Sequence, residues 1–125
     1  MRASLSTIKI LQQSNVLEIK FVRKIPKPGA ASTRRMICTG SLTLLNSPEG
    51  RIALNFRPAY NRPRYNPDMK NIAITWDIFM QDYRNINMNA CEVLAVIPVK
   101  DFWKFFNEKR LGQMSPGDKI RFMNT

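Results

Sequence analysis

The sequence has no histidine, only two cysteines among its 125 residues, and few acidic side chains. Without histidine, the chain has no side chain whose ordinary pKa suits proton transfer at neutral pH. Cys38 and Cys91 form no CxxC pair and therefore make a poor metal site. Two isolated cysteines are more often buried thiols than a disulfide, and we expect buried thiols here. Neither a GxSxG nor a GxxxxGK[ST] motif is present. These absences predict a protein without catalysis, metal or cofactor.

Long hydrophobic runs are also missing. No run approaches the roughly 20 apolar residues that span a membrane. Serine, threonine and lysine interrupt the N-terminal segment Met1–Asn15, so we expect no signal peptide. The length predicts a single domain, residues 1–125, and 44% hydrophobic residues are enough for a core.

Positive charge is abundant and unevenly distributed. The net charge is +11, and Glu18–Lys70 alone holds 11 basic against 3 acidic residues. Basic residues clustered in this way suit a polyanion, most often nucleic acid. A generally basic protein without such a partner is the simpler alternative.

Alternating apolar and polar residues predict several short strands. In the first strand, for example, Leu17, Ile19 and Phe21 face one way. The predicted strands are Leu17–Lys24, Thr33–Thr39, Arg51–Phe56, Asn71–Met80, Tyr83–Ile86, Cys91–Pro98 and Lys119–Met123. Cys91–Pro98 is apolar on both faces, which is typical of a central strand.

Two segments show helical spacing, Ala3–Ser14 and Asp101–Arg110, the second with Asp101 as its N-cap and Gly112 as its stop. The Gly40–Asn55 region is ambiguous. Turns are expected at Ser47–Gly50 and Ser115–Asp118. The spacing of strands and turns predicts a mainly β fold, a small barrel of five to six strands with a short N-terminal helix and an aromatic C-terminal helix.

Two basic segments are the candidate binding surface. The first two strands and the loop Ile25–Ser32 between them form a basic hairpin, and Arg57–Lys70 is a long loop rich in proline, tyrosine and arginine. Arginine and lysine can contact phosphates, and tyrosine can stack on bases. The candidate nucleic-acid-binding residues are Lys20, Arg23, Lys24, Lys27, Arg34, Arg35, Arg57, Tyr60, Arg62, Arg64, Tyr65 and Lys70.

The core of the chain resembles a known family. Leu17–Phe21 and Arg35–Thr39 are similar to the opening hairpin of the small Sm-like (SH3-like) β-barrel proteins of tailed bacteriophages. Ile74–Asp77, Asp82–Ile86 and Cys91–Pro98 resemble the second half of that barrel. The resemblance implies a viral protein in the cytoplasm of an infected host cell. The helix at Asp101–Arg110 and the long basic loop depart from the family pattern.

Two functions follow as hypotheses. The first is a non-catalytic, phage-type protein that binds DNA or RNA through the basic hairpin and loop. The alternative is a protein-interaction module, an inhibitor of a host protein or a virion component, that uses the same loop and Trp103. An exposed Trp103 would indicate such an interface, and a locally buried Trp103 would be part of the packing. We expect Asp77 to accept hydrogen bonds from the adjacent turn or to pair with Arg84. The strand predicted at Lys119–Met123 could close the barrel or pair with a neighbouring chain, so an oligomer is possible.

Overall fold

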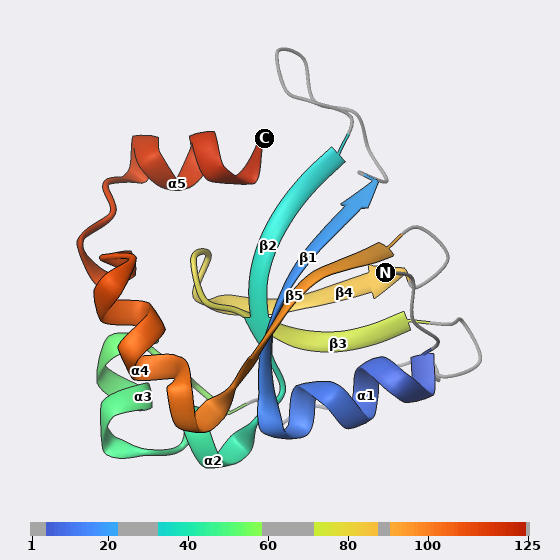
Figure 1. The fold of residues 1–125 in the computed structure, drawn as a ribbon, viewed down its shortest axis with the longest axis horizontal. Coiled ribbons are helices and arrows are strands. Elements are labelled where there is room, and N and C mark those ends of the chain that lie inside the picture. The colour runs from blue at the N-terminus through green and yellow to red at the C-terminus, as the bar shows by residue number, and fades with distance from the viewer. Residues whose placement is uncertain (1–4, 23–32, 59–71, 88–90, 125) are drawn as a thin grey trace.

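A computed structural model describes residues 5–22, 33–58, 72–87 and 91–124 of the chain. Its centre is one five-stranded antiparallel sheet with the strand order β4-β3-β2-β1-β5 (Figure 1). The strands are β1 (Asn15–Val22), β2 (Thr33–Thr39), β3 (Ile72–Asp77), β4 (Asp82–Asn87) and β5 (Cys91–Pro98). β4 and β5 are the two edges, and no pairing between their described residues closes the sheet into a barrel.

Helices surround this sheet. They are α1 (Leu5–Ser14), α2 (Leu42–Leu45), α3 (Pro48–Ala53), α4 (Val99–Glu108), the 3₁₀ turn η3 (Leu111–Gln113) and α5 (Pro116–Met123). In Figure 1, α3, α4 and α5 lie on one side of the molecule and α1 lies below β3. More of the described residues are helical than extended, so the mainly β prediction is only partly correct.

The strand predictions are largely confirmed. The strands Thr33–Thr39 and Cys91–Pro98 have the predicted bounds, and the hairpin of β1 with β2 is present. Cys91–Pro98 is nevertheless an edge strand, which corrects its prediction as central. Its apolar Leu94 and Val96 are about 40% exposed, at 42% and 39%.

Two predicted strands are helices. Arg51–Phe56 overlaps α3, and Lys119–Met123 lies within α5. In both cases a serine precedes a proline at the helix start and caps it, which satisfies a free backbone N–H. Ser47 Oγ accepts a hydrogen bond from Gly50 N at 3.0 Å, and Ser115 Oγ accepts one from Asp118 N at 3.1 Å. The predicted turns at these positions are therefore the first turns of helices.

The two predicted terminal helices are present with different ends. α4 begins at Val99 after Pro98, so Asp101 lies in its first turn and is not the N-cap. Arg110, with a φ of 52°, supplies the left-handed residue after this helix, and Gly112 lies in the following 3₁₀ turn. At the other terminus, α1 is fixed by Gln12, whose Nε2 donates to Ile74 O at 3.1 Å.

The core lies in two clusters, one on each face of the sheet. The first gathers around Trp76 and Phe102 and includes residues of β1, β2 and α4. The second lies between α1 and the sheet, where Leu17, Met36 and Cys38 are buried. Within the described ranges, no helix combines the length and the hydrophobicity that crossing a membrane requires.

Candidate nucleic-acid interface

Four of the twelve candidate residues lie in the described part of the chain: Lys20, Arg34, Arg35 and Arg57. The other eight lie outside the described residues, namely Arg23, Lys24, Lys27, Tyr60, Arg62, Arg64, Tyr65 and Lys70. The structure therefore tests the surroundings of the first four only.

The antiparallel register of β1 and β2 brings three of these residues together. Lys20 lies opposite Arg35, and Phe21 lies opposite Arg34. Directly opposite side chains are neighbours, so Lys20 and Arg35 share one face of the hairpin end, while Arg34 pairs with Phe21 on the other face. This local grouping agrees with the basic hairpin predicted from the sequence.

Arg34 is held in a buried ion pair. Its Nη2 donates to Asp77 Oδ2 at 2.7 Å, and the two side chains are 13% and 1% exposed. Its guanidinium carbon also lies 5.8 Å from the ring centre of Phe21. The expected partner of Asp77 across the hairpin was Arg84, so the structure corrects the partner to Arg34 on the neighbouring strand.

Asp77 also fixes the turn between β3 and β4. Its Oδ1 accepts hydrogen bonds from Phe79 N at 2.9 Å and Met80 N at 3.1 Å, which confirms the predicted role at this turn. Burial raises the pKa of the Asp77 carboxyl above its usual value, against the opposing effect of the Met80 N–H and of Arg34. Desolvation of the charge thus outweighs its favourable contacts.

Arg35 is also engaged. It forms an ion pair with Glu18 on β1, and its guanidinium carbon lies 4.4 Å from the ring centre of Phe122 on α5. Cation–π contacts favour this distance. Phe122 in turn packs edge-to-face on Phe79, with 5.0 Å between ring centres.

Helix α5 therefore covers part of the arginine pair, which the sequence analysis missed. Besides Phe122 on Arg35, Met123 Sδ lies 3.2 Å from Arg34 Nη2. The prediction of a strand at these residues concealed this arrangement. A helix beginning at the Ser115-Pro116 signal would have placed Phe122 and Met123 in its last turn rather than on opposite faces of a strand.

The remaining two candidates differ from the arginine pair. Lys20 is half-buried and Arg57 is exposed, and neither has an ion pair with the described residues. By contrast, the pairs Arg34–Asp77 and Arg35–Glu18 are each neutral overall and add little long-range attraction for a polyanion.

Much of the net charge lies in two segments that adjoin β1, β2 and β3 in the sequence. The described residues contain 13 basic and 8 acidic side chains, which gives +5, so +6 of the total +11 lies outside them. Residues 23–32 contribute +3 and residues 59–71 contribute +2. In Figure 1, the beginning of β3 lies on the side away from α3 and α4, whereas the open end of the β1–β2 hairpin lies near the end of α5.

Other candidate chemistry is not assembled in the described part of the chain. Asp77 and Asp82 face each other across the β3–β4 hairpin, but no group of three metal-ligating side chains occurs within the described ranges. Cys38 and Cys91 are both free and buried, as predicted, and burial raises their pKa values to about 12 and about 11. A thiol with such a pKa is a poor nucleophile at neutral pH.

Trp103 is half-buried, which answers the open question of its exposure. Its ring packs edge-to-face against Phe102 at 5.0 Å and Phe106 at 5.4 Å between ring centres. Much of this side chain therefore serves the packing of α4 and is not free for a partner.

The described residues define an antiparallel α+β domain with a basic hairpin beneath a C-terminal helix. No family model, curated protein or solved structure matches the chain. Its function is therefore inferred from its own residues.

Proposed function

We propose that this protein is a non-catalytic nucleic-acid-binding domain. The distribution of charge carries this proposal. The segments that follow β1 and precede β3, residues 23–32 and 59–71, hold a net +5. Positive charge concentrated in short segments of a chain attracts a phosphate backbone and releases its counterions.

We infer that the candidate residues divide by role. Lys20 and Arg57, which lack ion pairs among the described residues, are suited to phosphate contacts. Arg34 and Arg35 are tied to acidic partners and to α5, so they stabilise the hairpin that carries Lys20. Tyr60 and Tyr65 would add stacking on unpaired bases, worth about 1–3 kcal/mol per base.

A charge-reversal pair of variants tests this proposal. The first variant carries Arg57→Glu, Arg62→Glu and Arg64→Glu. The control carries Lys100→Glu, Lys104→Glu and Lys109→Glu, three exposed lysines in or just after α4. Both variants change the net charge by the same amount, so non-directional attraction falls equally in each.

Binding to a labelled single-stranded oligonucleotide is measured by fluorescence anisotropy at low salt. The loop variant should bind at least about tenfold more weakly than the control, because only it removes cations at the contact surface. Unchanged thermal melting verifies the fold. If the two variants lose affinity equally, or if the wild-type protein does not bind at low salt, the proposal fails.

A protein-interaction module is the second candidate. The exposed Leu94 and Val96 on the edge strand β5 favour it, because an open edge can pair with an extended segment of another protein. A pull-down from nuclease-treated host lysate separates the candidates, since a partner that survives nuclease is a protein.

We also propose that the sheet is a closed Sm-like barrel and that the protein comes from a tailed phage, acting in the cytoplasm of its host. The antiparallel β1–β2 hairpin and the pairing of β5 back onto β1 support the barrel. Solution NMR contacts between β4 and β5 would test its closure.

A further inference from the structure

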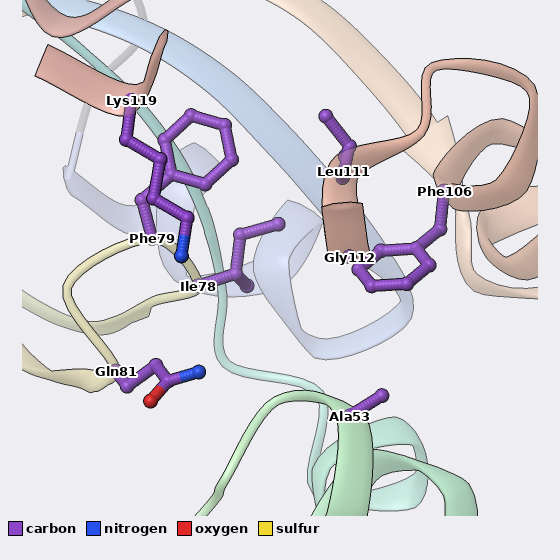
Figure 2. Close-up of a pocket in the computed structure, with 8 residues that line it drawn as sticks. All are labelled: Ala53, Ile78, Phe79, Gln81, Phe106, Leu111, Gly112 and Lys119. Atoms are coloured by element: carbon purple, nitrogen blue, oxygen red, sulfur yellow. The ribbon is translucent and has the colours of Figure 1, made fainter. Parts of the chain in front are cut away.

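A small pocket lies on the helical side of the molecule, apart from the proposed nucleic-acid interface. It encloses about 60 Å³ between α3, the β3–β4 turn, α4, η3 and α5. The lining residues are Ala53, Ile78, Phe79, Gln81, Phe106, Leu111, Gly112 and Lys119 (Figure 2). None of them belongs to the proposed nucleic-acid-binding set.

The polar side chains of this pocket are hydrogen-bond donors. Lys119 contributes an ammonium group that has no ion pair with any described residue, since its neighbour Asp118 pairs with Arg121. Gln81 Oε1 accepts a hydrogen bond from Asn55 Nδ2 at 3.4 Å, which leaves the Gln81 amide N–H groups for the pocket. In Figure 2, the side-chain nitrogen atoms of Lys119 and Gln81 both lie on the left of the view, across from Phe106.

The opposite side of the pocket is formed by an aromatic ring, a largely buried leucine and a glycine. Phe106, Leu111 and Gly112 lie across from Gln81 and Lys119 (Figure 2). A ligand that fits both sides needs an acceptor group with negative charge at one end and a short apolar body at the other. Its small volume excludes a long chain or a nucleobase with its sugar.

Residues with positive φ lie in and beside the pocket, at the end of α4 and in the β3–β4 turn. Three non-glycine residues in the described ranges have positive φ: Asn55 at 52°, Gln81 at 54° and Arg110 at 52°. Gln81 lines the pocket, Asn55 bonds to Gln81, and Arg110 directly precedes Leu111. Such conformations are costly for residues with a Cβ, and they cluster at binding sites, where the surrounding structure maintains them.

We propose that this pocket binds a carboxylate with a short apolar body. One carboxylate oxygen pairs with Lys119 Nζ, and the other accepts from Gln81 Nε2, while the hydrocarbon part contacts Phe106 and Leu111. Two donors match the two oxygens of a carboxylate, and a charge-assisted hydrogen bond is the stronger kind. This chemistry is shared by a free short-chain acid and by the C-terminus of a polypeptide.

An NMR titration of the full-length ¹⁵N-labelled protein tests the site. The probes are butyrate for the free acid, N-acetylvaline for a chain end, and butyramide as the neutral isostere. The side-chain amide of Gln81 and the backbone amide of Gly112 should shift and saturate with butyrate, with N-acetylvaline, or with both. Response to butyrate alone assigns a free acid, and response to N-acetylvaline alone assigns a chain end.

Two variants complete the test. Lys119→Met keeps the length of the side chain and should weaken carboxylate binding by at least about tenfold, the loss expected for one charged partner. Lys104→Met, at an exposed lysine of α4, should leave it unchanged. The proposal is overturned by equal binding of butyramide, by tighter binding of inorganic phosphate than of butyrate, by full affinity in Lys119→Met, or by no response to either acid. Because this site shares no residue with the nucleic-acid interface, its failure leaves that proposal untouched.

Discussion

Asp77 offers the sharpest test of how the fold is held together. Its side chain is 1% exposed, and its two oxygens have different partners. Oδ1 accepts from the backbone N–H groups of Phe79 and Met80, and Oδ2 accepts from Arg34. Replacing Asp77 with alanine removes every one of these acceptors.

The expected loss follows from these contacts. A buried N–H group without an acceptor costs about 1–3 kcal/mol, and the Phe79 N–H is buried. The Met80 N–H is closer to solvent and costs less. Arg34 would also lose its charged partner while 13% exposed. We therefore expect Asp77→Ala to lower the free energy of unfolding by about 3–5 kcal/mol, a large part of the stability of such a domain.

Asp77→Asn separates the two functions of the carboxylate. It retains an oxygen for the turn but removes the charge. Because burial raises the pKa of Asp77, the charge itself costs free energy in the folded state. The asparagine variant should therefore lose less than half as much stability as the alanine variant.

Urea denaturation of both variants, followed by circular dichroism, measures these differences. Asp118→Ala is the control, because it removes the exposed ion pair with Arg121 on α5 and should leave the midpoint unchanged. Equal losses for Asp77→Asn and Asp77→Ala would refute the reasoning. They would mean that Asp77 stabilises the fold through its charge and not through its hydrogen bonds to the turn.

Three further predictions follow from the structure. First, the pKa of Asp77 is raised in the folded state, so its contribution to stability is complete below the ordinary value of 3.8 and is lost as the pH rises through the folded pKa. The stability of the wild type relative to Asp77→Asn should therefore fall from about pH 4 towards neutrality, and a rise in this difference would contradict the prediction. Second, Cys38 and Cys91, with pKa values of about 12 and about 11, should react with a thiol reagent near pH 8 only after unfolding, and rapid labelling of native protein would show that the second core cluster is open. Third, Ser47→Ala should cost about 1 kcal/mol in urea denaturation through loss of the α3 cap, whereas Ser47→Asn should cost less; equal losses would mean that the hydroxyl does not act as a cap.

The sequence predicted those elements whose pattern is local and periodic. β1 and β2 alternate clearly, and residues 33–39 and 91–98 form the predicted strands. The same pattern misled at Lys119–Met123, because short alternating runs also fit one turn of an amphipathic helix. The Ser-Pro pairs at 47–48 and 115–116 were the overlooked signals, since both residues favour a helix start.

The candidate site was predictable in composition but not in pairing. Charge counting located the basic hairpin, and the β1–β2 register placed Lys20, Arg34 and Arg35 together. The sequence could not show that Arg34 pairs with Asp77, 43 residues away, because such pairs depend on which strands become neighbours. The same holds for the edge position of β5, which is set by strand order and not by hydrophobicity.

Nucleic-acid binding through the basic segments is the central claim, and the salt dependence of affinity tests it most directly. Single-strand binding weakens with salt by a slope of about −0.7 per neutralised phosphate in a plot of log K against log salt concentration. If four to eight of the proposed cations make contacts, the wild-type slope should lie between about −3 and −6. The Arg57, Arg62 and Arg64 charge-reversal variant should have a slope that is shallower by about 2. A wild-type slope near zero, or an unchanged slope in that variant, would contradict the claim.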